Sequence, residues 1–391
     1  MHVHGDVDEG FGAVADAFRR NFDQHGEIGA AVAVYEGDRL VVDLWGGYRD
    51  RRRTQPWERD TMVPVFSSTK GMAAFVLAML VSAGHLDYDE PVVTYWPEFA
   101  AHGKEQVTVK QLLDHQAGLP TIDQRLTLTD ILDLDKVAAA LAAQRPYWRP
   151  GTAHGYHSIS LGLYEGELAR RADPRHRSLG RYFADEIATP LDVDFFIGLP
   201  DDVDTAALAT PIPATPVAAV RYERDLNVRF GASLVLPSSL ARKSLRNPAI
   251  NPFRTTGREF LAPELPGSNG VGTARGLARV YGAAAARTGE LLITPDVLDQ
   301  LGREVPPSVP GHDRVLQVHS NYHLGFRKPS RSIRFGSDGR AYGTTGMGGS
   351  FGFADPTTGF GFAYVMNRLG MSIMSDIRCR KLYRAVFAPT S

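Results

Sequence analysis

Pro64-Val65-Phe66-Ser67-Ser68-Thr69-Lys70-Gly71, followed at once by the apolar run of residues 72–80, is the stretch that most constrains this chain. Serine favours the N-cap of a helix, and the run beyond it is apolar throughout. The pattern therefore predicts a buried helix that begins near Ser67 and ends near Gly84. Lys70 then lies one turn beyond Ser67 on the same face, with its amine within reach of the serine hydroxyl.

The Ser67 and Lys70 pair has two interpretations. A serine hydroxyl is a weak nucleophile at neutral pH, and a lysine among apolar neighbours can take its proton, so the pair could form a catalytic unit. The structural alternative is a capped helix that carries a surface lysine. Residues elsewhere in the chain must decide between them.

Composition narrows the class of protein. The chain has 391 residues, of which 43% are hydrophobic and 22% charged, with a formal net charge of -1. A near-neutral chain lacks the cationic face that binds nucleic acid, so we expect no nucleic-acid partner. The single cysteine, Cys379, excludes an intramolecular disulfide and a cysteine-based metal cluster. We expect no cofactor and no metal.

The termini and apolar runs bear on location. The longest apolar runs are shorter than a membrane span, so we expect no membrane partner. The first residues lack a positive flank followed by an apolar core, which favours a cytoplasmic protein. His2 and His4 could bind a metal as an alternating pair, but a frayed terminus is the preferred interpretation. The sequence does not indicate which oligomeric state the protein adopts.

Periodicity predicts an α/β (α+β) fold in which both termini supply one antiparallel sheet. A helix over 9–24 precedes strand patterns at 28–35, 40–45 and 61–66, and further strand patterns lie at 322–326, 341–344, 349–354 and 360–367 before a helix at 375–387. Helical patterns at 108–113, 135–144, 161–171 and 273–286 fill the middle. We expect residues 1–86 and 300–391 to form the discontinuous α/β domain and residues 87–299 a mainly helical inserted domain, with long loops over 204–263 that cover or shape a cleft.

Two further segments suit an acyl-transfer site. Tyr156 stands on a loop at the entrance of a predicted helix, where a tyrosine near a lysine could carry protons; a buried core tyrosine is the alternative. The glycine-rich segment 343–350 could bring backbone N–H groups close to a developing oxyanion, whereas a simple hairpin turn would use glycines as well. The order serine-lysine, tyrosine, glycine-rich strand favours the catalytic interpretation.

With these segments in place, the chain resembles the serine β-lactamase and penicillin-binding-protein-like superfamily, and within it the class C β-lactamase-like carboxylesterases called family VIII. The resemblance spans nearly the whole chain in the expected order. It is carried by Ser67-x-x-Lys70, residues 107–120, Trp148-x-Pro150-Gly151-Thr152, Tyr156-x-Ser158, residues 269–275 and residues 346–352.

The resemblance implies a role for each matching residue. Ser67 would be the acylated nucleophile, Lys70 its proton partner, and Tyr156 the residue that shuttles protons and activates the deacylating water; the sequence does not settle which of Lys70 and Tyr156 is the base. The backbone N–H groups of Ser67 and Met347 would form the oxyanion hole. The substrate-binding residues implied are Ser158, Thr344, Thr345, Gly346, Gly348 and Gly349.

One departure from the superfamily pattern affects the expected substrate. The third motif usually begins with lysine or histidine, but here it reads Thr344-Thr345-Gly346. A cation at that position would attract a substrate carboxylate, whereas threonine supplies only a hydrogen bond. We therefore expect a serine carboxylesterase acting on small, uncharged esters. The alternatives are a β-lactamase, D-amino-acid peptidase or amidase, an acyltransferase using the same acyl-enzyme, and a non-catalytic binding or scaffold protein.

Overall fold

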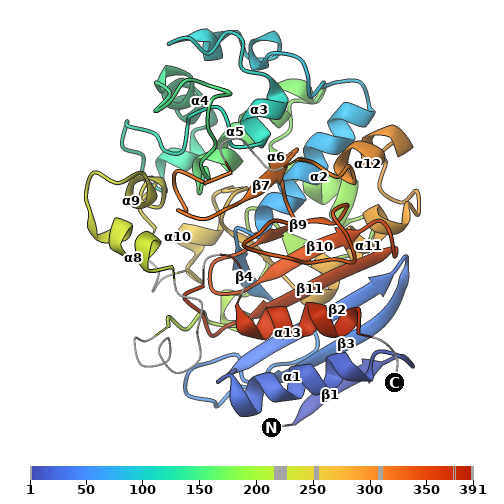
Figure 1. Cartoon of the computed structure of the whole chain (residues 1–391). Coiled ribbons are helices and arrows are strands. Elements are labelled where there is room, and N and C mark those ends of the chain that lie inside the picture. The colour runs from blue at the N-terminus through green and yellow to red at the C-terminus, as the bar shows by residue number, and fades with distance from the viewer. Residues whose placement is uncertain are drawn as a thin grey trace.

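An eight-stranded antiparallel sheet, built by the two ends of the chain, forms the base of the protein (Figure 1). The computed structural model describes residues 2–214, 227–250, 255–306, 311–372, 374 and 376–388. The predicted sheet and fold class are confirmed. In order of adjacency the strands are β1 (Val3–Val7), β3 (Arg39–Gly47), β2 (Gly29–Glu36), β11 (Phe360–Met366), β10 (Phe351–Asp355), β9 (Tyr342–Thr345), β8 (Phe326–Lys328) and β7 (Asn321–His323).

Helices cover both faces of this sheet. Helices α1 (Gly12–Gln24) and α13 (Ile377–Val386) pack together on one face, and α11 (Ala274–Ala286) lies on the other (Figure 1). Because both faces are covered, the central strand β2 is buried from Gly29 to Val34 and reads as an almost continuous apolar run. Helix α11 approaches β11 so closely that a Cβ added at Gly361 would lie 2.1 Å from the backbone nitrogen of Gly282.

Helix α2 (Thr69–Ser82) runs through the middle of the molecule. Every residue from Thr69 to Leu80 is buried, because the helix packs against α5 (Ser160–Ala172) and α6 (Leu179–Phe183) as well as against β8 and β9. A helix that is buried all round needs an apolar sequence on every face. The predicted buried helix is therefore confirmed.

A second, three-stranded antiparallel sheet leads into α2. It consists of β4 (Val63–Phe66), β6 (Gly270–Gly272) and β5 (Phe195–Phe196), with β6 in the centre. Strand β4 ends at the residue before Ser67. Its pairing with β6 brings the chain around residue 267 to the start of α2, although some 200 residues separate the two segments.

The remaining helices are mostly short, and α3, α4 and α5 gather at the top of Figure 1, where α3 contacts β7 at the edge of the large sheet. They are α3 (Val109–Leu113), α4 (Leu134–Ala143), α8 (Val228–Val235), α9 (Leu240–Ser244), α10 (Arg258–Leu261) and α12 (Pro295–Leu301), with single turns η1 (Val92–Thr94), η2 (Pro97–Ala100), η3 (Asp130–Leu132), η4 (Ala184–Ala188) and η5 (Thr205–Ala207). Helices α3, α4, α5 and α11 confirm the four helical patterns predicted for the middle of the chain, whereas α8, α9, α10 and α12 were not predicted.

Three expectations differ from the structure. The residues of the expected frayed terminus form β1, whose backbone pairs with β3. The expected single strand at 322–326 is the hairpin β7–β8, because Leu324 and Gly325 both adopt positive φ (52° and 88°), as a two-residue hairpin turn requires. Helix α11 packs on the large sheet, so the segment expected to be an inserted domain returns to the α/β layer before residue 299. In addition, the region 204–263, expected to consist of long loops, contains the helices α8, α9 and α10 among its described residues. Residues 215–226 and 251–254 of that region lie outside the described residues.

Candidate active site

A tight strand-to-helix turn presents Ser67. Strand β4 ends at Phe66, which is buried and has a φ of 50°, an uncommon value for a bulky residue. Two contacts of the Thr69 hydroxyl hold the turn: it donates to the carbonyl of Phe66, and it accepts from the N–H of Gly270 at 2.8 Å. Ser67 is partly exposed, although the residues on either side of it are buried.

Lys70 is buried directly behind Ser67. The residue is only 1% exposed, and its Nζ lies 3.2 Å from Ser67 Oγ. The same nitrogen lies 2.6 Å from the carbonyl oxygens of Ser158 and Gly267. Two carbonyl acceptors take two N–H bonds of the amine and leave its third direction for Ser67 Oγ. A neutral amine in this setting would point its lone pair at the serine hydroxyl, which is the geometry that proton transfer requires.

Tyr156 stands beside this pair, as its position before α5 predicted. Lys70 Nζ lies 4.9 Å from the centre of the Tyr156 ring. The ring stacks on Tyr322 with centroids 5.9 Å apart, and the backbone N–H of Tyr156 donates to Asp313 Oδ1 at 3.1 Å. The tyrosine is therefore fixed from both sides next to the serine and lysine.

Two buried histidines next to Tyr156 brace the loop. Burial lowers the pKa of His157 to about 4, and burial followed by the neighbouring His157 lowers the pKa of His115 well below its ordinary value. His115 Nδ1 accepts from the N–H of His157 at 3.0 Å, and His157 Nε2 accepts from the N–H of Leu119 at 2.9 Å. Because both imidazoles are neutral and accept backbone hydrogen bonds, they shape the loop rather than carry protons.

The backbone N–H groups of Ser67 and Met347 have no acceptor among the described residues. Met347 follows β9 at the rim of the same cavity as Ser67. An N–H that is left free at a helix entrance and another at the end of a strand suit an oxyanion, which needs preorganised donors.

A cluster of short contacts holds the Met347 loop against the start of α2. Ser350 Oγ donates to the carbonyl of Val65 at 2.8 Å and lies 3.1 Å from Ser68 Oγ. Gly346 sits within this cluster, where an added Cβ would lie 2.1 Å from Ser350 Oγ and 2.2 Å from the Val65 carbonyl oxygen. Only glycine allows the backbone at position 346 to lie so close to Val65 and Ser350. Gly346 thereby sets the position of the neighbouring Met347.

A cavity of about 560 Å³ opens in front of Ser67. Of the predicted residues, those that line it are Ser67, Tyr156, Ser158, Thr345, Gly346, Met347 and Gly348. Sequence reasoning missed Arg327 of β8 and the apolar wall formed by Val228, Phe230 and Leu234 of α8. The only sequence signal for that wall was the expectation that residues 204–263 shape a cleft.

Thr344 and Gly349 do not line the cavity, contrary to their predicted role. Thr344 is on the opposite face of β9 from Thr345, because side chains alternate along a strand. Its hydroxyl donates to the Ser68 carbonyl at 3.0 Å, accepts from the N–H of Gly71 at 3.2 Å, and lies 3.1 Å from the Tyr281 hydroxyl. Gly349 backs onto Asp376, with a φ of 123°. Thr344 thus fixes β9 to α2.

Glu165 of α5 is a buried carboxyl group that interacts electrostatically with Lys70. Burial raises its pKa to about 8, and the charge of Lys70 opposes that rise. Neither carboxyl oxygen has a hydrogen-bond partner among the described residues. The group is therefore neutral at pH 7 and does not act as a counter-ion for the lysine.

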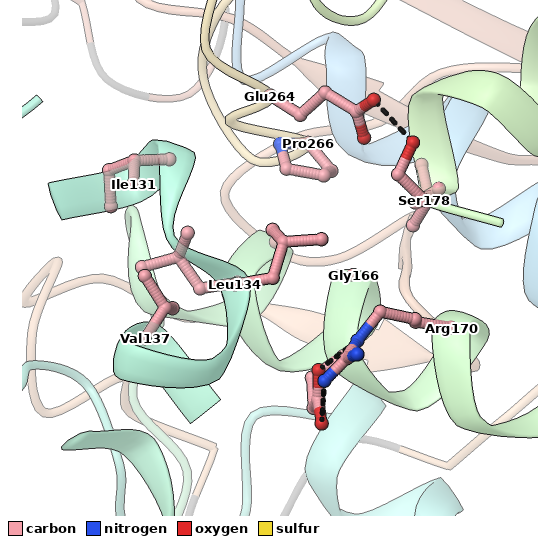
Figure 2. A pocket seen from close by; sticks show the side chains of 12 residues that line it. Ile131, Leu134, Val137, Gly166, Arg170, Ser178, Glu264 and Pro266 are labelled. Carbon is pink, nitrogen blue, oxygen red and sulfur yellow. Dashed lines mark hydrogen bonds and ion pairs between the residues drawn. The ribbon is translucent and has the colours of Figure 1, made fainter. Parts of the chain in front are cut away.

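A second, much smaller cavity of about 30 Å³ lies between α4, α5 and the chain near Pro266 (Figure 2). Its charged groups are already paired. Ser178 Oγ donates to Glu264 at 2.6 Å, and Arg170 forms an ion pair with Glu167 at 2.9 Å, as Figure 2 shows. With room for little more than one water and no free charge, this cavity is a packing gap.

The described residues contain neither a metal-binding cluster nor a membrane-spanning helix. Within those ranges, no cluster of three or more His, Cys, Asp or Glu side chains is arranged to hold a metal ion. In the same part of the chain, no helix combines the length and apolar character needed to cross a bilayer.

Comparison with known proteins identifies the family of this chain. Residues 14–378 match the family described as "Beta-lactamase". The chain belongs to the beta-lactamase family. Among curated members, "Esterase/beta-lactamase LipL" of Mycobacterium tuberculosis is 35% identical over 379 residues, covering 94% of this chain and 83% of its own. The family's serine hydrolase fold and esterase members match the predicted resemblance.

Two solved structures are similar to this chain over nearly its full length. A family VIII carboxylesterase is 36% identical with a TM-score of 0.87, and the match covers 99% of both chains. EstA from Arthrobacter nitroguajacolicus Rue61a is 32% identical with a TM-score of 0.82, covering 99% of this chain and 97% of that one.

Proposed function

We propose that this chain is a carboxylesterase that cleaves small-molecule esters through an acyl intermediate on Ser67. The observation that carries the proposal is the placement of Lys70 Nζ, 3.2 Å from Ser67 Oγ with two carbonyl acceptors fixing its orientation. Similarity to proteins described as esterases supports the reaction class.

Acylation would begin with attack of Ser67 Oγ on the ester carbonyl carbon. The serine proton passes to the unprotonated amine of Lys70 as the new C–O bond forms, either directly or by way of the Tyr156 hydroxyl, which accepts it and gives its own proton to Nζ. The carbonyl oxygen gains negative charge, which the N–H groups of Ser67 and Met347 stabilise. When the bond to the alcohol breaks, the same proton carriers return a proton to the departing oxygen, which leaves as a neutral alcohol.

Deacylation would repeat these steps with water as the nucleophile. Tyr156 lies at the cavity beside Lys70 and accepts a proton from the water as the water oxygen attacks the acyl carbon, while its own hydroxyl proton passes to Lys70 Nζ. The bond between that carbon and Ser67 Oγ then breaks, and Ser67 regains its proton. No step requires a cofactor.

A burst experiment tests the proposal. Mixing the enzyme with 4-nitrophenyl butyrate should release one equivalent of nitrophenol rapidly and leave a butyryl group on Ser67, detectable by mass spectrometry. Ser67→Ala and Lys70→Ala should each abolish the burst and lower kcat by at least about 10³-fold. Ser82→Ala, at the far end of α2, is the matched control and should retain it. A full burst in Ser67→Ala would refute the proposal.

Hydrolysis of β-lactams is a second candidate, favoured by the relative described as an esterase/beta-lactamase. Turnover of a chromogenic cephalosporin, compared with that of the butyrate ester, separates the two reactions. Acyl transfer would use the same acyl-enzyme, and added alcohols or amines would then appear in the products.

A further inference from the structure

Arg327 brings a positive charge into the substrate cavity. It stands on β8, is only 3% exposed, and lines the cavity that Ser67 and Tyr156 also line. Every other described residue of that lining is uncharged. The charge that a ligand would meet there is therefore positive.

Arg327 has no carboxylate partner among the described residues. Its Nη1 lies 3.4 Å from Met374 Sδ, which is a weak acceptor, and its Nη2 lies 3.4 Å from the Tyr322 hydroxyl, which is a long contact. The guanidinium also lies over two rings, 5.1 Å from the centre of Tyr322 and 5.9 Å from that of Tyr156. These contacts hold the group in place and leave its charge uncompensated at short range.

The carboxylate of Asp313 is linked to Arg327 through the Tyr322 hydroxyl. The Tyr322 hydroxyl donates to Asp313 Oδ2 at 3.0 Å. The other oxygen, Asp313 Oδ1, accepts the N–H groups of Tyr156, Val315 and Leu316. Both oxygens of Asp313 are therefore occupied by other donors.

Arg378 shows how the same protein treats a buried arginine that serves structure alone. That side chain is fully buried and paired with two carboxylates, Glu27 at 2.7 Å and Asp376 at 2.8 Å. A buried charge is costly unless it is paired, and a guanidinium matches a carboxylate with two parallel hydrogen bonds. Arg327 has the burial of Arg378 and lacks its partners.

We propose that Arg327 is an anion-binding residue of the substrate cavity, and that the preferred esters carry a carboxylate. The inference rests on the proposed esterase function and names its substrate class. It also reverses the preference for uncharged esters expected from Thr344, because the cation missing from that position is supplied by β8.

Matched ester pairs test the proposal. For a carboxylate on the acyl side, the pair is the 4-nitrophenyl monoester of glutaric acid and its carboxamide analogue. For a carboxylate on the alcohol side, it is the acetate ester of 4-hydroxybenzoate and that of 4-hydroxybenzamide. The wild-type enzyme should prefer the charged member of one pair by about 10- to 100-fold in kcat/KM, as a charge-assisted hydrogen bond predicts. The pair that shows the preference identifies the side of the ester that faces Arg327.

Two variants assign the preference to Arg327. In Arg327→Gln the ratio of charged to neutral kcat/KM should fall close to one, and in Arg327→Lys part of the preference should remain. Free glutarate should inhibit turnover of the neutral ester by the wild type and do so less well with Arg327→Gln. Thermal unfolding and fluorophosphonate labelling of Ser67 check that each variant is folded with a competent serine.

Two outcomes would overturn the proposal. A wild-type enzyme with no preference in either pair lacks the anion site. An unchanged ratio in Arg327→Gln, with both esters slowed equally, would make Arg327 a residue that positions Tyr156. In the first case the Ser67-dependent burst on the neutral ester still stands, so the proposed function and the anion site fail separately.

Discussion

Replacing Gly346 by alanine tests how the oxyanion hole is built. The added methyl would lie 2.2 Å from the carbonyl oxygen of Val65, where an ordinary contact begins at 3.4 Å. Because that oxygen belongs to the backbone of β4, the Met347 loop has to retreat by roughly 1 Å, which is enough to spoil most of a hydrogen bond. Loss of one oxyanion donor costs about 10²- to 10³-fold in kcat.

The assay for Gly346→Ala is the burst on 4-nitrophenyl butyrate, with kcat and KM measured in the steady state. We expect kcat to fall by about 10²-fold or more, because in the proposed mechanism the Met347 N–H stabilises the oxyanion of the transition state, whereas KM should change little. Gly12→Ala is the matched control, since nothing lies within 4 Å of a methyl at that position. A folded Gly346→Ala enzyme with kcat within about threefold of the wild type would show that Met347 donates no catalytic hydrogen bond.

Three further substitutions test separate features of the molecule. Because burial raises the pKa of Glu165 to about 8 from an ordinary 4.5, the folded protein holds a proton that the unfolded chain releases, and stability is lost as pH rises between those values. Between about pH 5 and pH 7 the wild type should therefore lose about 2.5 kcal/mol of unfolding free energy relative to Glu165→Gln, which corresponds to roughly 3 °C in Tm. The exposed control Glu9→Gln should show no such change relative to the wild type. A difference between Glu165→Gln and the wild type that does not depend on pH would contradict the reasoning. Arg378→Met leaves two buried carboxylates without their partner and should lower the unfolding free energy by about 3–5 kcal/mol, or Tm by roughly 4–6 °C. Arg384→Met, at an exposed position of the same helix, is the control, and an equal loss of stability in both variants would contradict this prediction. Leu234→Ala widens the cavity at its apolar wall and should raise the ratio of octanoate to butyrate ester turnover about 10-fold. Val235→Ala, at a position 72% exposed on the same helix, is the control. The same turnover ratio in both variants would place Leu234 outside the acyl site.

The predicted parts of the fold depend on short-range patterns. Strand alternation at both ends of the chain and the apolar run after Ser67 predicted the sheet and the buried helix, because each pattern reflects which faces of one element are covered. Strand β1 and the β7–β8 hairpin were missed. Their residues carry too little apolar alternation, and their structure depends on the β3 edge and on two consecutive positive φ angles.

The Ser67 and Lys70 pair was determined by the sequence alone, because one helical turn fixes the distance between residues three apart. The position of Tyr156 before a predicted helix made it a candidate, and family resemblance added its role and the oxyanion role of Met347. No local rule connects either residue to Ser67. Which face of β9 meets the cavity was decided only by tertiary packing: a shift of one residue exchanges Thr344 with Thr345, and the sequence does not fix that phase. Arg327 is the clearest case. Nothing near it in the sequence marks it, and its charge matters because β8, α8 and the Ser67 turn enclose one cavity.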